Sequence, residues 1–409
     1  LVLASTAVSV SGLAMRLFFS LSVLFLLSGQ AVADADPPRP FVADHDGPFI
    51  EVTGPPEMVF DWTTDRCYDA QIPDLPVRAF RDAEGQVNLI LSHTNGYAMR
   101  GPDFDSLSID CTPLMTSSAD SDPSQFNDHE WIAAVYALED GTVHALVHNE
   151  YQGNRYPTGC ESAEYFRCWY NAITSAVSTD WGRTFDHAVA PPGHVVATIT
   201  DVYAPDEGIF GAFSPSNIIE RDGHYYAFLK LQTYPFGDQH TCLMRTDDLS
   251  DPSSWRHWTP GGFTGQFADP FRDDLNALRI SECLPISLDA IAQVYESINW
   301  DTALGQYILT GTSSDAQREP NPFGFYYAIS DDLTAWPRRQ PLMEVRLPWR
   351  ANGQQTTYLY PTLIDHDSDS RNFETTGETA YLYYTRLNFG SGNLDRDLLR
   401  VPVAIRDAR

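Results

Sequence analysis

The chain runs WIAAVYALEDGTVHALVHNE over residues 131–150. Two apolar segments of strand length, Trp131–Leu138 and Val143–Glu150, flank the turn Glu139–Gly141 in this stretch. An amphipathic helix would need a longer run with a 3.6-residue period, whereas two short segments around a glycine turn are typical of an antiparallel hairpin. The stretch therefore predicts a β-hairpin, and the same pattern returns along the chain.

Five copies of this hairpin pattern occur in the sequence. Their first segments are residues 76–80, 131–138, 213–219, 295–300 and 358–364, and their second segments are 87–93, 143–150, 225–230, 307–310 and 380–386. Three copies continue into a third strand, an aspartate turn and an aromatic residue, at 176–185, 244–255 and 328–336. Units of this size cannot bury both faces alone. Together they predict an all-β fold, a five-bladed β-propeller, whose aromatic residues pack between neighbouring units.

The start of the sequence resembles an export signal. Met15-Arg16 precedes the apolar segment Leu17–Leu27, and Ala31-Val32-Ala33 follows as a cleavage site of the A-x-A type. We expect residues 1–33 to be an upstream extension and signal peptide, and residues 34–409 to be a single propeller domain. No later segment approaches the roughly 20 apolar residues that cross a bilayer. A secreted or periplasmic protein with no membrane span in its mature chain is therefore expected.

All six cysteines follow residue 33, and an even number suits an oxidising compartment. Cys160 and Cys168 close a short loop, so this pair is predicted first. Proximity alone suggests Cys67 with Cys111 and Cys242 with Cys283, one of about 15 connectivities for six cysteines. No C-x-x-C spacing or histidine cluster accompanies the cysteines, so no metal site is predicted.

The charge balance narrows the choice of partner. The sequence has 26 Lys+Arg against 55 Asp+Glu, a formal net charge of -29. A polyanion would be repelled over most of such a surface, so no nucleic acid is expected. The hydrophobic content of 43% excludes a disordered chain. A monomer is expected.

Several motifs carry a resemblance to known propellers. Residues 178–185, Ser-Thr-Asp-Trp-Gly-Arg-Thr-Phe, match the Asp-box pattern S-x-D-x-G-x-T-F of sialidases and other propellers. The Asp-Asp-Leu turns before Trp255 and Trp336, with the segments Ser214–Asn217 and Tyr360–Thr362, resemble five-bladed propeller glycoside hydrolases of families 43, 62, 32, 68 and 117. The resemblance covers most of the mature chain and implies cleavage of glycosidic bonds. Family 43 takes its catalytic base from an Asp-Pro pair at the start of blade 1. This chain departs from that pattern and has Ile72-Pro73-Asp74-Leu75-Pro76 there.

Three carboxylic acids are the catalytic candidates. Propellers place the starts of their innermost strands around one mouth of a central channel, and glycoside hydrolysis needs one protonated and one ionised carboxyl there. Asp74 lies between two prolines before the first strand, where turn capping is the competing interpretation. Glu150 ends an apolar run between Asn149 and Tyr151. Glu296 precedes a predicted strand, and a structural role for this acid is the competing interpretation.

Other polar residues at these positions are candidates for substrate binding. Arg78 in an apolar strand needs an anionic partner, either a protein carboxylate or a substrate. Two roles compete for His129 and His148, namely binding of a central cation and simple hydrogen bonding. The sequence requires no cofactor. The only lysine of the chain is also included. The full set is Arg78, His129, Glu130, His148, Tyr151, Asn217, Lys230, Tyr360 and Arg386.

These residues support a secreted glycoside hydrolase that acts on an extracellular poly- or oligosaccharide through a carboxylate acid/base pair. One alternative is a sialidase-like exo-glycosidase, with Arg78 as a carboxylate-binding arginine and Tyr358 or Tyr360 as nucleophile. The other alternative is a noncatalytic carbohydrate-binding propeller. Turnover of a glycan separates the enzymes from the binding protein.

Overall fold

The computed structural model describes residues 37–41, 47–162, 164–233, 239–275, 283–317, 321–351, 355–388 and 394–408. The predicted signal peptide lies outside these residues. Strands dominate, and the two α-helices of the described ranges, α1 (Trp62–Asp65) and α2 (Leu288–Ile291), are each a single turn. None of the described helices has the length and apolar character needed to cross a membrane.

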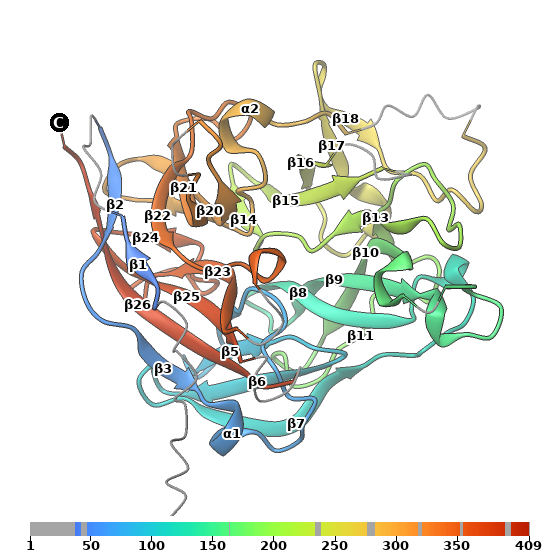
Figure 1. The fold of residues 1–409 in the computed structure, drawn as a ribbon, viewed down its shortest axis with the longest axis horizontal. Coiled ribbons are helices and arrows are strands. Elements are labelled where there is room, and N and C mark those ends of the chain that lie inside the picture. The colour runs from blue at the N-terminus through green and yellow to red at the C-terminus, as the bar shows by residue number, and fades with distance from the viewer. Residues whose placement is uncertain are drawn as a thin grey trace, which may run out of the picture. The chain divides into compact units, whose positions relative to one another are not determined.

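The strands form five consecutive antiparallel units, here called blades 1 to 5 (Figure 1). Blade 1 contains β4 (Arg78–Arg81), β5 (Val87–Leu91), β6 (Asn95–Gly101) and β7 (Ser108–Thr116). Blade 2 contains β8 (His129–Ala137), β9 (Val143–Gln152), β10 (Cys168–Ser178), β11 (Asp186–His187) and β12 (Val195–Ala197). Blade 3 contains β14 (Ile219–Arg221), β15 (His224–Gln232), β16 (Gln239–Thr246), β17 (Arg256–Thr259) and β18 (Gly262–Gln266).

Blade 4 contains β19 (Ser297–Asp301), β20 (Gln306–Ser314), β21 (Phe323–Ser330) and β22 (Gln340–Glu344). Blade 5 contains β23 (Thr357–Ile364), β25 (Thr379–Leu387) and β26 (Arg396–Arg406). Three short strands attach to these sheets, namely β1 (Arg39–Pro40) on β22, β24 (Thr375–Thr376) on β19, and β13 (Gly208–Phe213) between β10 and β15. The predicted all-β, five-bladed propeller is confirmed.

The two ends of the described chain meet in blade 5. Strands β2 (Phe49–Val52) and β3 (Glu57–Phe60) both pair antiparallel with β26, the last strand. Blade 5 is therefore built from segments at both ends of the sequence, as the blue and red ribbons beside each other in Figure 1 show. This pairing joins the first and last parts of the propeller through backbone hydrogen bonds.

The predicted first strand of blade 3, residues 213–219, is interrupted in the structure. Strand β13 ends at Phe213 and β14 begins at Ile219. Pro215 lacks the N–H that a sheet ladder needs. The Asn217 side chain instead pairs with the backbone of Ile298 in blade 4, donating to its carbonyl at 2.7 Å and accepting from its amide at 2.9 Å. Asn217 thus ties two blades together.

Apolar clusters fill the spaces between neighbouring blades. The aromatic residues that end the aspartate turns are buried there, as the sequence predicts. Phe185 packs with Ile90 and Leu114 of blade 1, and the Trp336 ring meets Phe228 of blade 3 edge to face with 6.0 Å between centroids. Turn residues therefore stabilise the contact of one blade with the next.

One arginine touches all five blades. Arg78, in β4 of blade 1, donates Nε to the Ala133 carbonyl of blade 2 at 2.8 Å. Its Nη2 donates to the carbonyls of Pro215 before β14 and Glu296 before β19, at 3.2 and 2.9 Å. Its Nη1 donates to Thr362 Oγ1 of blade 5 and to the Val77 carbonyl. A guanidinium has about five N–H donors, so none of them is left for a ligand.

A segment between β23 and β25 closes the opposite end of the central channel. Residues 371–374 accept a hydrogen bond from a backbone amide of each of the other four blades. The donors are the backbone amides of Arg81, Ala137, Glu220 and Trp300, at 2.8, 2.7, 2.8 and 2.9 Å. Because the ends of the inner strands are occupied in this way, the starts of these strands form the end where a ligand can approach.

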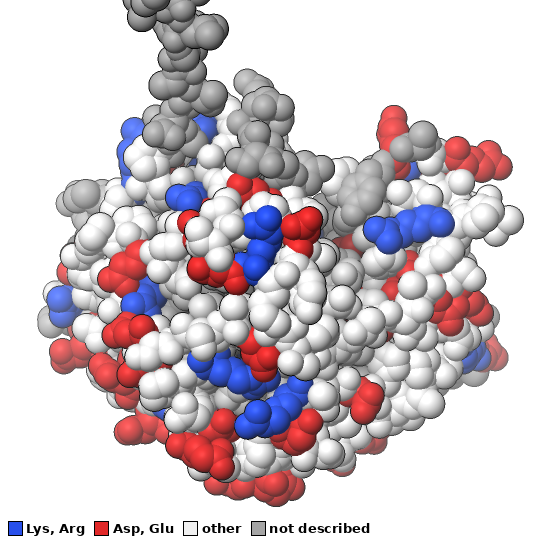
Figure 2. All heavy atoms as spheres, turned by 90° about the horizontal axis from the view of Figure 1, so that it is seen from below, with Lys and Arg blue, Asp and Glu red and all other residues white. Residues whose placement is uncertain are grey.

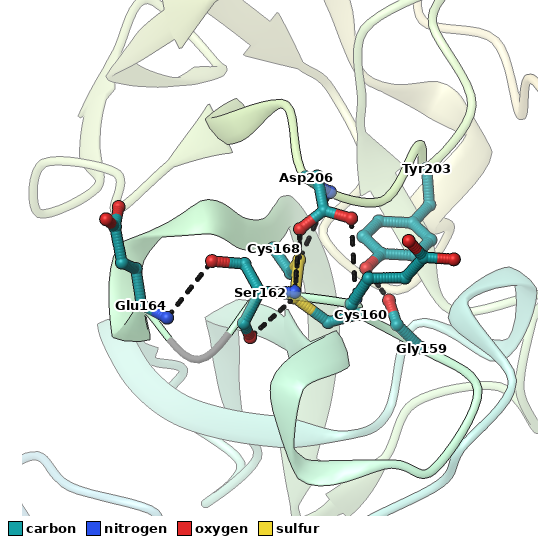
Figure 3. Close-up of a disulfide and its surroundings, with 8 residues drawn as sticks. Gly159, Cys160, Ser162, Glu164, Cys168, Tyr203 and Asp206 are labelled. Atoms are coloured by element: carbon teal, nitrogen blue, oxygen red, sulfur yellow. Dashed lines mark hydrogen bonds between the residues drawn. A yellow bond between two sulfur atoms is a disulfide. The ribbon is translucent and has the colours of Figure 1, made fainter.

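All three predicted disulfides are present, namely Cys67–Cys111, Cys160–Cys168 and Cys242–Cys283. Figure 3 shows the carboxylate of Asp206 directed at the Cys160–Cys168 bridge and at the Ser162 amide, which donates to Asp206 Oδ1 at 2.9 Å. This bridge closes a loop that follows β9. The bridge attaches Cys160 to the first residue of β10, the strand that pairs with β9.

Candidate active site

The first carboxylate of the site is held by two partners from blade 5. Asp74 precedes β4, and its Oδ1 accepts a hydrogen bond from the Tyr360 hydroxyl at 3.2 Å and forms an ion pair with Arg396. The Asp74 and Arg396 side chains are 19% and 17% exposed, so solvent reaches both. A neighbouring guanidinium and a donated hydroxyl favour an ionised carboxylate.

A β-bulge brings Tyr360 to this position. The pairing of β23 with β25 shifts register between Leu359 and Thr362, and Tyr360 adopts a φ of 62°. The left-handed region is unfavourable for a tyrosine, and bulges often reorient a side chain beside a functional site. The local break in the strand thus directs the Tyr360 hydroxyl to Asp74.

Glu296 lies in the opposite kind of environment. It precedes β19, and its Oε2 accepts a hydrogen bond from the Thr312 amide. Burial raises the pKa of Glu296 to about 7, although the Thr312 hydrogen bonds and the charges of Arg78 and Lys230 oppose this rise. A carboxyl with this pKa is substantially protonated near neutral pH.

Lys230 approaches Glu296 from blade 3. Its Nζ lies 4.1 Å from the centroid of the Phe213 ring. Burial lowers the pKa of Lys230 to about 8, and the charge of Glu296 acts in the opposite direction. Lys230 therefore adds a cation that limits the pKa rise of Glu296.

Glu150 is the third acid of the group. His148, Glu150 and Gln152 lie on one face of β9 because alternate strand residues point the same way. His148 Nε2 lies 3.1 Å from Glu150 Oε1, and Gln152 Nε2 donates to Oε2 at 2.9 Å. The Glu150 side chain is 14% exposed and thus accessible to a ligand.

Aromatic rings form a wall beside Glu150. The Trp131 ring lies 6.0 Å from His93 and 5.8 Å from His148, and His148 stacks near Phe213 with 6.3 Å between centroids. Burial lowers the pKa of His93 to about 4, so this ring is neutral at pH 7. A wall of aromatic rings next to carboxylates is suited to the apolar face and the hydroxyls of a sugar.

The Tyr360 hydroxyl links the three acids electrostatically. It donates to Asp74, and burial, followed by the charges of Glu150 and Glu296, raises the pKa of Tyr360. Acids from blades 1, 2 and 4 thus act on a hydroxyl from blade 5. All three catalytic candidates from the sequence belong to this cluster, together with the substrate-binding candidates Tyr360, Lys230 and His148.

Other sequence candidates lie in structural contacts. Arg78 has all its donors occupied by the five blades, and Asn217 pairs with Ile298. Tyr151 donates to the Ser121 carbonyl at 3.1 Å. Arg386 binds Asp397 Oδ2 through Nε and Nη2, at 3.0 and 2.7 Å. For Arg78 in particular, the geometry corrects the expectation of a substrate-binding role, because a guanidinium without free N–H groups cannot bind a ligand anion.

His129 and Glu130 point to opposite faces of β8. The His129 ring lies 6.3 Å from Trp131, and its Nδ1 is 2.8 Å from Asp128 Oδ1. Glu130 Oε1 instead lies 2.7 Å from His187 Nε2. His129 therefore borders the aromatic wall, whereas Glu130 belongs to a different cluster.

Two site residues were not found from the sequence. Arg396 reaches Asp74 across 322 positions of the chain, so no local pattern could connect them. His93 ends the predicted segment 87–93, but nothing in that segment distinguishes a buried ring beside Trp131 from a surface histidine. Long-range blade closure, rather than local spacing, brings both to the site.

No family model and no curated protein sequence matches the chain. Similar solved structures are glycoside hydrolases. A glycosyl hydrolase from Bacteroides ovatus is similar over 90% of this chain and 96% of its own, with 12% identity and a TM-score of 0.45. An α-L-arabinanase of Cellvibrio cellulosa, in complex with arabinohexaose, is similar over 79% of this chain and 90% of its own, with 14% identity and a TM-score of 0.42. The propeller fold itself follows from the strand pairing.

Proposed function

We propose that the protein is a glycoside hydrolase in which Glu296 is the general acid and Asp74 the ionised carboxylate. The observation that carries this proposal is the contrast between the two groups around Tyr360. Asp74 has an arginine partner and a donated hydroxyl, whereas Glu296 is only partly accessible to solvent and has a pKa that desolvation raises to about 7. Carboxyls whose environments differ in this way divide the acid and base roles in glycosidases.

The proposed reaction needs a proton for the leaving oxygen and a carboxylate on the other side of the anomeric carbon. Glu296 donates its proton to the glycosidic oxygen as the bond to the anomeric carbon breaks. Asp74 either removes a proton from the attacking water or attacks the anomeric carbon directly; in the second case water then cleaves the bond between Asp74 and the sugar, and the ionised Glu296 takes the proton of that water. The ionised Glu296 that results is stabilised by Lys230 and by the Thr312 amide.

Glu150 and the aromatic wall are proposed to hold the sugar. His148 and Gln152 fix the Glu150 carboxylate, leaving its remaining lone pairs for sugar hydroxyls. His93 is partly exposed and offers a ring edge for the apolar side of a pyranose or furanose, with the buried Trp131 ring behind it. The sialidase-like alternative is disfavoured because Arg78 has no free donor for a substrate carboxylate.

We further propose that the enzyme acts outside the cytoplasm on a poly- or oligosaccharide. Three disulfides fit an oxidising compartment, as does the predicted signal peptide. Figure 2 shows acidic side chains over much of one face, with basic groups between them. Such a surface suits an uncharged glycan better than a polyanion.

Hydrolysis of a glycan library tests the function. We expect release of reducing sugar from at least one glycan, and we expect Asp74→Asn to lower that turnover by about 10²–10⁴-fold, the usual contribution of a general base. The matched control is Asp110→Asn, which removes an acid paired with Arg100 in the outer part of blade 1. Measurable glycan binding without turnover would instead support the noncatalytic propeller.

The pH profile gives a second prediction. The pKa of Glu296 is raised to about 7, and only the protonated form can donate to the leaving oxygen. We therefore expect kcat/KM to fall by about tenfold per pH unit above this pKa, because kcat/KM follows the ionisation of the free enzyme. Initial rates between pH 5 and pH 9 would show this limb. A profile that stays flat through pH 8 would contradict the role of Glu296.

A further inference from the structure

A second cluster of titratable side chains lies in blade 2, apart from the proposed active site. Glu130 comes from β8, His187 from β11, and His194 from the loop before β12. One ligand atom from each of the three lies within 4.8 Å of the others. Glu130 is on the face of β8 opposite to Trp131, because successive strand residues alternate. The cluster is therefore distinct from the aromatic wall.

Two buried acceptors in this cluster have no hydrogen-bond partner in the described structure. They are Glu130 Oε2 and His194 Nδ1, on residues that are 1% and 0% exposed. His194 Nε2 lies 3.1 Å from the Phe126 carbonyl, which can only accept a hydrogen bond. Since a neutral imidazole has a single N–H, this contact leaves Nδ1 with a free lone pair. The Pro192 carbonyl also acts on this ring but does not meet hydrogen-bond geometry at Nδ1.

The backbone around the cluster is held in place. The Glu130 amide donates to Ser117 Oγ at 2.9 Å. The Ser175 amide and hydroxyl both donate to the His194 carbonyl, at 2.9 and 3.1 Å. The His187 and His194 rings lie 4.6 Å apart. The three side chains are thus directed at one point from β8, from β11 and from the loop before β12.

We propose that Glu130, His187 and His194 bind a divalent transition-metal ion, with Zn²⁺ the best fit. Two imidazoles and one carboxylate are a common donor set for zinc, whereas calcium and magnesium favour oxygen ligands throughout. The Phe126 carbonyl supplies the outer partner that a ligating histidine usually has. The His187 side chain is 18% exposed, so water can complete a tetrahedral site.

An ion binds here if the Glu130–His187 pair separates and any longer distance to His194, up to 4.8 Å, shortens. Two ligands of a tetrahedral zinc lie about 3.3 Å apart at bond lengths of about 2.0–2.1 Å. Glu130 Oε1 and His187 Nε2 are now 2.7 Å apart, a hydrogen-bond distance. Binding replaces the shared proton with the ion and separates the pair by a few tenths of an ångström. The ion would connect an inner strand of blade 2 with its outer strand and the following loop.

Zinc binding to the full chain without a histidine tag tests the proposal. After treatment with chelator, incubation with Zn²⁺ and desalting, elemental mass spectrometry should find about one zinc per chain, and Zn²⁺ should raise Tm by mass action. His187→Ala should lose both effects. The matched control is His224→Ala, because His224 also contacts one carboxylate, that of Asp247, on the protein surface. No cysteine thiol competes, since all six form disulfides.

A second variant protects the test against misfolding. Glu130→Gln keeps the size of the side chain and removes the anionic ligand, and we expect it to bind zinc at least tenfold more weakly. Circular dichroism would first establish that each variant keeps the β-sheet spectrum. Absence of zinc from the wild-type chain would overturn the proposal. So would zinc binding that is unchanged in both His187→Ala and Glu130→Gln.

Discussion

Replacing Glu296 with glutamine should lower turnover by about 10²–10⁴-fold, the usual contribution of a general acid. Glutamine keeps the shape of the protonated carboxyl, and its amide oxygen can still accept from the Thr312 amide. The melting temperature should therefore stay close to wild type. Rates measured on aryl glycosides with good and poor leaving groups would identify the step, because a good leaving group needs no proton. The loss should be smallest for the best leaving group.

Glu374 provides a matched control for this experiment. It lies in the segment that closes the other end of the channel, accepts the Glu220 amide at 2.8 Å, and has a pKa that burial raises to about 7. Glu374→Gln should leave turnover near wild type. The pKa of Glu374 in the folded state lies above the ordinary glutamate value of 4.5, so ionisation weakens the fold as pH rises from about 4.5 to 7. The variant should therefore reduce this loss of stability. Equal losses of turnover in both variants would contradict a specific role for Glu296.

The sequence predicts the blades because their signals are local. The hairpin at residues 131–150, its four counterparts and the aromatic residues after each aspartate turn depend on neighbours within about ten positions. The disulfides join cysteines that are consecutive in the sequence, so their order along the chain sufficed even for Cys67–Cys111 and Cys242–Cys283, which are 44 and 41 positions apart. Fold class was thus accessible from spacing alone.

The site could be predicted only in part because its chemistry depends on closure of the propeller. Asp74 and Glu296 were selected by their positions before inner strands, but their different environments arise from Arg396 and from burial. Glu130 shows the limit most clearly. The sequence makes it a substrate-binding candidate, yet the structure buries it beside His187, which is 57 positions away. Neither partner nor burial can be derived from local sequence.

Replacing Arg78 with methionine is expected to destabilise the fold by several kcal/mol, because each buried acceptor left without a donor costs about 1–3 kcal/mol. Methionine fills a similar volume but donates no hydrogen bond. The carbonyls of Ala133, Pro215 and Glu296 would then lose a donor at the point where all the blades meet. Thermal and urea denaturation would measure the loss.

The effect on kinetics separates this structural role from substrate binding. Arg406→Met is the control, because Arg406 pairs with Glu51 at the surface and both side chains are nearly half exposed; such a pair contributes about 1 kcal/mol or less. If Arg78 connects the blades, Arg78→Met lowers Tm strongly, and the folded fraction at low temperature keeps a KM near wild type. An unchanged Tm with a large rise in KM would show instead that Arg78 binds the substrate, as the sequence alone suggested. Because all five guanidinium donors already bind protein oxygens, the first result is the one the structure requires.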